Sequence, residues 1–276
     1  DGSLLAEYAR ERRLYLPIQA VPKRVIHAFL SAEDKNFYEH GGIDFFNGTE
    51  LKTIVKLEGS GCYRIIPVRQ HPGIYYVLEI GGLHRLSARP DGTWEHAFLA
   101  KPADFIVTAQ EDERGRLWVG TIGQGAFTFD PQGKEFVPVT HPATGRPLTG
   151  MVSVIATNDA ILLLNREGSL RCGLDGTGLR ALSGMPSVDP LYAAHFGAHN
   201  ETAIVFKHST SPENARERSG VLGKEKGDNY SWRELDVPGG SAIGSINALE
   251  FTQEDGQPIL WLGGSTGLLR LDYDAI

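Results

Sequence analysis

A short stretch near the start of the chain, SAEDKNFYEHGGIDF (31–45), carries residue types that could do chemistry. It places the carboxylates of Glu33 and Asp34 and the imidazole of His40 close together in sequence. If the stretch is helical, apolar residues share a face with Glu33. They are Ile26, Phe29, Leu30 and Phe37. Apolar surroundings raise the pKa of a carboxyl group, which suits proton transfer near neutral pH, so the stretch looks like the start of an active site.

The surrounding residues predict the elements that must hold this stretch. Residues 1–17 read as two short strands around a charged turn, and residues 22–39 read as one helix. Pro22 suits a first helical turn, where its missing N–H costs nothing. Gly41 and Gly42 then end the helix. We therefore expect a short N-terminal appendage of strands and a helix.

Residues 1–45 resemble the first part of the family 51 peptidoglycan glycosyltransferases, the module of class A penicillin-binding proteins. The first motif of that family is Glu-Asp, two residues, Phe, two residues, His, one residue and Gly. Every fixed position is matched here, by Glu33, Asp34, Phe37, His40 and Gly42. The resemblance implies that Glu33 acts as a general base on lipid II, with Asp34 and His40 orienting it or tuning its charge. It also implies a periplasmic or cell-envelope location.

The family pattern stops where the predicted helix stops. In the family, a further helix, a Gly-Gln-Gly-Ala-Ser-Thr-Ile-Thr-Gln-Gln stretch and charged residues that grip the pyrophosphate come next, and this sequence lacks them. A base alone does not make a glycosyltransferase site, because the donor and the acceptor must also be held. The change at Phe45–Phe46 predicts a chimeric chain, whether by gene fusion, by an error of sequence assembly or by deliberate joining.

From Thr49 onward the hydrophobic period changes to two, and strand-like runs alternate with turn signals. Register marks on corresponding strands lie 42, 45, 42 and 56 positions apart. These marks are Tyr76, Trp118, Leu163, Val205 and Trp261. A period of this length with four strands in each unit is typical of a β-propeller. The last interval contains a polar insert, STSPENARERSGVLGKEKGDN (209–229), which we expect to be a surface loop.

We predict a mainly β fold, in which residues 49–276 form a propeller of about five four-stranded blades. The last blade lacks an outermost strand, and the alternating segment 49–57 precedes the first full blade. Pairing of 49–57 with 267–273 would close the ring and cover two exposed sheet edges. A truncated array with missing blades is the alternative.

Two of the repeats also resemble a known family. The units DERGRLWVGTIGQGAFTFD (112–130) and DGQPILWLGGSTGLLRLD (255–272) share the pattern Asp, Gly, Leu-Trp-hydrophobic-Gly and then a Gly followed by hydrophobic residues. This pattern resembles the periplasmic propeller repeats of two-component regulators. The resemblance covers residues from about 49 to 276 and implies a sensing module, although such arrays usually have more than five blades.

Composition narrows the classes of function. The net charge of −7 and the pI near 5.7 argue against a nucleic-acid partner, which needs a concentrated basic face. No run approaches the roughly 20 apolar residues that span a bilayer, so we predict no membrane span in this chain. No secretory signal is visible. The chain begins at Asp1 rather than Met, so we expect that an upstream segment has been removed or lies outside it.

The cysteines and tryptophans predict packing rather than chemistry. Cys62 and Cys172 sit in alternating apolar runs, which favours two buried free thiols over a disulfide. Trp118 and Trp261 occupy equivalent positions on central strands, where we expect them to pack between blades. On the outer strands, we expect partly exposed tryptophans at Trp94 and Trp232.

The histidines of the repeat region show no metal-ligand spacing, so we predict neither a metal site nor a cofactor. They are His71, His84, His96, His141, His195, His199 and His208. His195 and His199 could both point into one blade edge, and a strand-and-turn placement explains them equally well. Local hydrogen bonding in turns accounts for several aspartates, namely Asp91, Asp112, Asp159 and Asp255.

These patterns favour one function and leave a second open. The leading hypothesis is a non-catalytic binding or sensing module, which takes a sugar, a small ligand or a protein partner at a propeller rim. The alternative is a peptidoglycan glycosyltransferase fragment that polymerises lipid II with Glu33 as general base.

Overall fold

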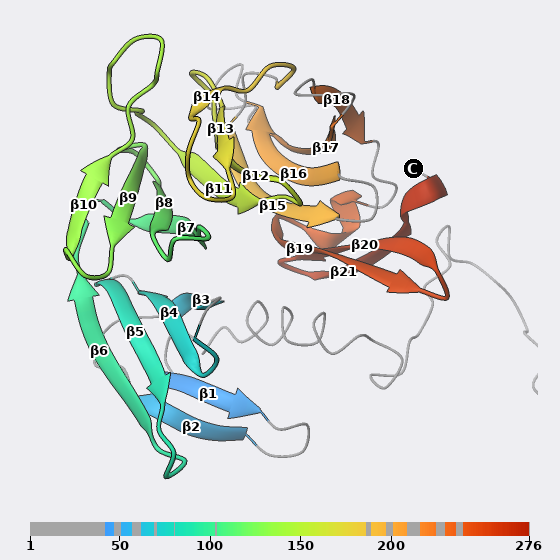
Figure 1. The fold of residues 1–276 in the computed structure, drawn as a ribbon. Coiled ribbons are helices and arrows are strands. Elements are labelled where there is room, and N and C mark those ends of the chain that lie inside the picture. Colours follow the sequence, from blue (N-terminus) through green and yellow to red (C-terminus); the bar gives the residue numbers. More distant parts are fainter. Residues whose placement is uncertain are drawn as a thin grey trace, which may run out of the picture.

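The computed structural model describes most of the chain from Gly42 onward. The described residues are 42–46, 51–56, 62–68, 71–79, 81–102, 104–185, 189–196, 201–208, 216–224, 230–235 and 240–275. Within them the protein consists of antiparallel strands and two short 3-10 helices, η3 (Gly240–Ile243) and η4 (Tyr273–Ala275) (Figure 1). None of the described helices has the length and apolarity that crossing a membrane requires. The helix predicted for 22–39 lies outside the described residues.

The strands form successive small sheets, as the repeat predicted. The first sheet contains β3 (Cys62–Pro67), β4 (Ile74–Glu79), β5 (Gly82–Ala88) and β6 (Trp94–Ala100). The second contains β7 (Ile106–Glu111), β8 (Leu117–Thr121), β9 (Ala126–Asp130) and β10 (Glu135–Pro138). The third contains β11 (Val152–Ala156), β12 (Ala160–Asn165), β13 (Leu170–Gly173) and β14 (Arg180–Ala181). In each sheet every strand is hydrogen-bonded to the next one along the chain.

Two further sheets complete the series. The fourth sheet contains β15 (Asp189–Phe196), β16 (Glu201–His208), β17 (Arg216–Lys224) and β18 (Tyr230–Leu235). The fifth has three described strands, β19 (Ile246–Glu254), β20 (Gln257–Gly264) and β21 (Gly267–Asp272). The first strands of successive sheets, β3, β7, β11, β15 and β19, lie side by side, and the sheets fan outward from them (Figure 1).

One prediction about the fourth sheet is wrong. The polar insert 209–229 was expected to be a surface loop, yet β17 lies within it and pairs with β16 from Glu201↔Gly223 to His208↔Arg216. The backbone N–H and C=O groups of a strand pair in the same way whether its side chains are polar or apolar. The polarity of the side chains therefore predicted a loop where backbone pairing forms a strand.

The core lies between neighbouring sheets. The two faces of a central strand pack against different neighbours. On β12, Ile161 and Leu163 pack against residues of the second sheet, whereas Leu162 and Leu164 pack against the fourth. On β8, Leu117 faces the first sheet. All the residues of β8 and β12 are buried. Because side chains alternate along a strand, such strands require a neighbour on both faces of their sheet.

A hairpin covers the outer face of the first sheet. It consists of β1 (Gly42–Phe46) and β2 (Leu51–Lys56), which pair from Gly42↔Lys56 to Phe46↔Leu51. Its Ile43 is buried in a cluster with Val77 and Leu86 of the first sheet. The opposite face of that sheet packs against the second sheet.

This pairing corrects the prediction that 49–57 joins 267–273 to close the last blade. Among the described strands, β2 pairs with β1, and β21 pairs with β20 alone. Closing the short loop between β1 and β2 costs much less chain entropy than closing a loop that spans nearly the whole chain. The local partner therefore wins.

Sheet-to-sheet contact should tolerate no side chain at Gly120 of β8. A Cβ atom there would lie 2.1 Å from the carbonyl oxygen of Val152 on β11. We expect Gly120→Ala to lower the free energy of unfolding by about 1–3 kcal/mol through overpacking, as measured by urea denaturation. Gly81→Ala is the matched control, because a Cβ atom at Gly81 meets nothing within 4 Å. Equal stability of the two variants would contradict this account of the packing.

Candidate functional site: a buried Glu-His-His cluster beside a rim pocket

The residues of the first sequence motif lie outside the described part of the chain. They are Glu33, Asp34, Phe37 and His40. Their predicted roles, and the predicted helix that carries them, stay predictions.

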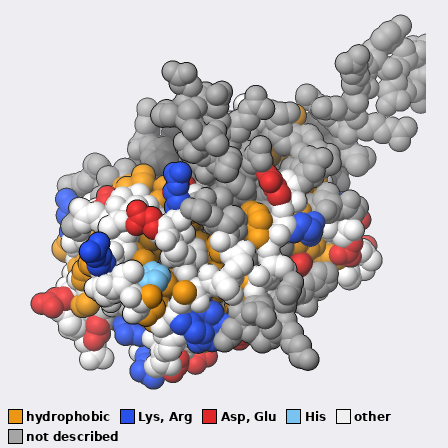
Figure 2. Space-filling model, turned by 90° about the horizontal axis from the view of Figure 1, so that it is seen from above, with side chains coloured by type: hydrophobic (Ala, Val, Ile, Leu, Met, Phe, Trp, Pro, Cys, Tyr) orange, Lys and Arg blue, Asp and Glu red, His pale blue; other side chains and the backbone are white. Residues whose placement is uncertain are grey.

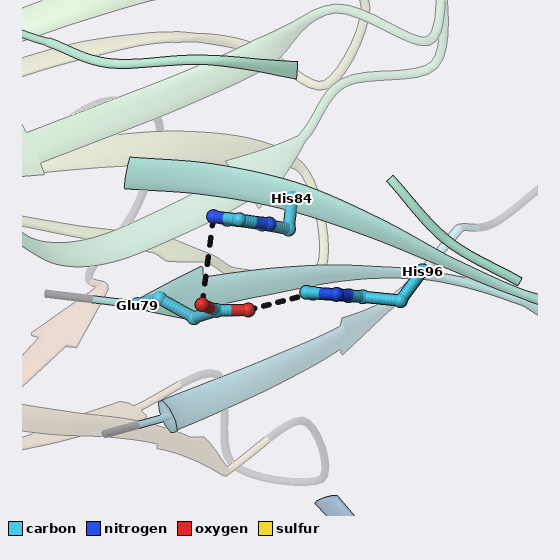
Figure 3. Close-up of side chains that lie close together, drawn as sticks. All are labelled: Glu79, His84 and His96. Carbon is cyan, nitrogen blue, oxygen red and sulfur yellow. Dashed lines mark hydrogen bonds and ion pairs between the residues drawn. The ribbon is translucent and has the colours of Figure 1, made fainter. Parts of the chain in front are cut away.

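The structure instead brings together a carboxylate and two imidazoles on the first sheet (Figure 3). Glu79 ends β4, His84 lies on β5 and His96 on β6. Glu79 Oε1 lies 2.7 Å from His96 Nε2, and Glu79 Oε2 lies 3.5 Å from His84 Nε2. The Glu79 side chain is only 2 % exposed, and those of His84 and His96 are 14 % and 20 % exposed.

Strand register explains why these side chains meet. His84 pairs with Val77, and His96 pairs with Leu86, so all three members of the cluster project from one face of the sheet. The β4–β5 turn is tight because Gly82 has φ +145° and a Cβ atom there would lie 2.7 Å from the carbonyl oxygen of Ala100. Glycine is required at this position, and it brings the end of β4 back beside the start of β5.

The two imidazole rings stack in parallel. Their centroids are 4.7 Å apart with an interplanar angle of 3°, and the edge of Phe98 contacts His84. Burial lowers the pKa of His84; the nearby Glu79 carboxylate opposes this shift and His96 adds to it. Nδ1 of His84 is buried and has no hydrogen-bond partner. Since the His96 contact of 2.7 Å is a hydrogen bond, one of its two atoms carries a proton.

A pocket of about 250 Å³ opens beside the cluster. Its lining residues are Glu79, Gly82, Lys101, Pro102, Asp104, Phe105 and Ile106. Asp104 fixes one wall, because its Oδ2 accepts hydrogen bonds from the backbone N–H groups of Gly123 and Gln124. Burial raises the pKa of Asp104, but these bonds and one from Phe105 N–H outweigh it and lower the pKa overall.

Two hydrophobic side chains stand exposed at this edge of the sheets, one in the pocket lining and one next to it in the structure. Phe105 is 36 % exposed and Ile122 is 50 % exposed. The two are neighbours, since the Ile122 N–H donates to the carbonyl oxygen of Phe105. Both belong to connections at the same edge of the sheets as the β4–β5 turn. We call Phe105, Ile122 and the pocket residues the rim site.

Charge is spread rather than gathered over the described part of one face. On the face shown in Figure 2, Lys and Arg side chains are interspersed with acidic and hydrophobic ones.

Three of the four tryptophans lie where the sequence predicted; Trp261 is buried, but the described residues that it clusters with, Ile259 and Leu268, belong to its own sheet. Trp118 and Trp261 are buried on the second strands of their sheets, and Trp118 packs between the second and third sheets. The indole N–H of Trp118 donates to Asp112, and that of Trp261 donates to Thr252. Trp94 and Trp232 are half-buried on the outer strands β6 and β18.

Asp112 does more than shape a turn. It is buried and also accepts hydrogen bonds from the backbone and side chain of Arg116, whose guanidinium lies 5.0 Å from the Trp118 ring centroid.

Cys172 is a buried free thiol, as predicted, and burial raises its pKa to about 12. The side chain of Cys62 lies outside the described residues.

His195 makes structural contacts. Its Nδ1 lies 3.1 Å from Thr202 Oγ1 on the paired strand, and its Nε2 lies 3.3 Å from Asn158 Oδ1. Burial lowers its pKa, and the nearby Asp159 carboxylate partly offsets this shift. The side chains of His199 and His208 lie outside the described residues.

Sequence reasoning missed the Glu79–His84–His96 cluster because no two of its members show a metal-ligand spacing. One signal was available. In three consecutive predicted strands joined by short turns, same-face positions can be counted from the alternation, and Glu79, His84 and His96 fall on one face.

Comparison with known proteins divides the chain in two. Residues 1–54 match the Transglycosylase family. Penicillin-binding protein 1A of Rickettsia conorii is 56 % identical over 46 residues, which are 17 % of this chain and 6 % of that protein. Penicillin-binding protein 1A of Escherichia coli is 41 % identical over 44 residues, 16 % of this chain and 5 % of that protein. The predicted N-terminal resemblance is confirmed, and this chain spans only a small fraction of those relatives.

The remaining residues match solved β-propellers. Virginiamycin B lyase from Staphylococcus aureus aligns with a TM-score of 0.56 at 12 % identity, covering 84 % of this chain and 73 % of that one. The N-terminal domain of Nup159 aligns with a TM-score of 0.51 at 12 % identity, covering 83 % and 64 %. At such identities the likeness establishes the propeller fold and not a shared activity.

The lowered pKa of His195 makes stability depend on pH. The unfolded chain binds a proton at the ordinary histidine pKa and the folded chain resists it, so the free energy of unfolding should fall as the pH drops from about 7.5 to about 5.5. One unequal proton contributes at most about 1.4 kcal/mol per pH unit. We expect His195→Gln to flatten the pH dependence measured by urea denaturation. His71→Gln, at an exposed histidine, should not. An unchanged slope in His195→Gln would refute the assignment.

Proposed function

We propose that this chain is a non-catalytic, five-bladed β-propeller recognition module of the cell envelope, joined to an N-terminal segment of transglycosylase ancestry. The five sheets with adjacent first strands support the ring. So does the link between its two ends: burial lowers the pKa of Arg64 on β3, and the Glu250 carboxylate on β19 opposes the shift. Arg64 is surrounded by protein and still accessible to solvent, which fits a side chain in a central channel.

The rim site is the observation that carries the recognition role. Exposed Phe105 and Ile122 stand beside a pocket of about 250 Å³ that also presents Lys101 and the carboxylates of Glu79 and Asp104. Binding sites for small ligands combine apolar surface with a few placed polar groups. The rim site suits a sugar or another small ligand with one apolar face, and a protein partner could use the same surface.

Lipid II polymerisation with Glu33 as general base is the competing function, and the family match over residues 1–54 favours it. The described strands argue the other way. From β3 onward the chain builds propeller sheets where that family places the rest of its module. A base without substrate-holding groups is not a working site.

Binding should depend on the apolar part of the rim site. We expect Phe105→Ser and Ile122→Ser each to weaken binding of soluble peptidoglycan glycan strands by about tenfold or more, since losing a buried apolar side chain costs about 1.5–3 kcal/mol. Isothermal titration calorimetry gives the affinities. Val137→Ser is the matched control, because Val137 is 56 % exposed on the outer strand β10. If all three variants bind like the unmodified chain, the rim site is not where the glycan binds.

The enzymatic alternative has its own test. We expect the whole chain to form no glycan polymer from lipid II, and Glu33→Gln to behave identically. Polymer formation that Glu33→Gln abolishes would overturn the non-catalytic proposal and establish the glycosyltransferase function.

A further inference from the structure

We propose that Glu79, His84 and His96 form a binding site for a divalent transition-metal ion, with Zn²⁺ as the best fit. Nothing in the propeller likeness or in the transglycosylase segment assigns a metal to these residues. The proposal rests on the cluster itself and does not depend on what ligand the rim site binds.

The donor set is the first argument. Two imidazole nitrogens and one carboxylate oxygen are a common zinc ligand set, and this mixture is poorly suited to Ca²⁺ or Mg²⁺, which prefer oxygen ligands alone. One donor atom from each residue can be chosen so that all three lie within 4.8 Å of one another. Tetrahedral zinc ligands at about 2.0–2.1 Å from the metal stand roughly 3.3 Å apart. Each imidazole already lies close to one oxygen of the Glu79 carboxylate, His96 Nε2 at 2.7 Å from Oε1 and His84 Nε2 at 3.5 Å from Oε2, so modest side-chain shifts would bring the three donors to that separation.

Pre-organisation is the second argument. The ligands come from three adjacent strands whose register holds their side chains on one face of the sheet. The Glu79 carboxylate is almost fully buried, where an anion needs a cationic or hydrogen-bonding partner. His96 already shares a hydrogen bond with this carboxylate, and a divalent ion between the carboxylate and the two imidazoles would hold the same three groups through its own charge.

Metal binding requires the two imidazole rings to move, because they are parallel. A metal bound to both Nε2 atoms lies near both ring planes, and planes 3° apart do not converge on one point. The rings must therefore tilt toward each other. For His84 the tilt breaks no hydrogen bond at Nδ1, which has none. The ring it contacts, Phe98, is 58 % exposed and has room to move.

The site leaves a coordination position open. Three protein ligands hold a tetrahedral zinc ion with the fourth position free for water or a ligand. Of the three ligands only Glu79 also lines the rim pocket, and we expect the open position to be reached from that side.

The test is metal binding by the full chain after treatment with a chelator and without any glycan present. We expect one Zn²⁺ ion per chain by calorimetry, and visible absorption bands of a tetrahedral centre when Co²⁺ replaces it. His84→Ala and His96→Ala should each weaken Zn²⁺ binding by more than about 100-fold. A residue that only hydrogen-bonds to a metal ligand would cause a smaller loss when removed. His71→Ala should bind like the unmodified chain, because His71 is exposed and outside the cluster.

A second measurement uses the unmodified chain, so the proposal can be refuted even if the histidine variants fail to fold. Zn²⁺ in excess of its dissociation constant should raise the unfolding temperature of the chain. If neither that rise nor the Co²⁺ bands are seen, the metal site is refuted. The cluster would then be a hydrogen-bonded group that links three strands. Full binding by a folded His84→Ala variant would refute it equally. Neither result bears on glycan binding by Phe105 and Ile122.

Discussion

The rest of the structure depends on the burial of both faces of the central strands. Leu162 and Leu164 on β12 face one neighbour, while Ile161 and Leu163 face the other. A single small sheet cannot cover such a strand, because alternate side chains leave on opposite sides. The second, third and fourth sheets meet this demand because each packs between two other sheets. The outer face of the first sheet meets the same demand with the β1–β2 hairpin.

The candidate site is a consequence of that arrangement. Glu79 is the last residue of a strand whose interior is buried, and so its carboxylate is drawn out of water with the strand. An isolated buried charge would cost several kcal/mol. Polar partners are therefore needed to compensate for the lost hydration of the carboxylate. Two histidines from the next two strands meet that requirement, and the rim pocket opens where their sheet ends.

The sequence predicted what depends on local patterns. The repeat spacing and the alternation placed the sheets, and the equivalent positions of Trp118 and Trp261 predicted buried tryptophans. It failed where the partner of a residue is set by the fold. Polar β17 is a strand because β16 pairs with its backbone, and β2 pairs with β1 because a short loop is cheaper to close. The cluster around Glu79 needs three strands in register before its members become neighbours.

The hairpin lies where the two regions of similarity meet. The family match runs to residue 54, yet β1 and β2 are part of the wall of the first propeller sheet, with Ile43 buried against it. The two regions of similarity therefore share one folded unit. The chain enters the described structure at Gly42 already paired in a strand, so the first sheet fixes its course from that residue onward.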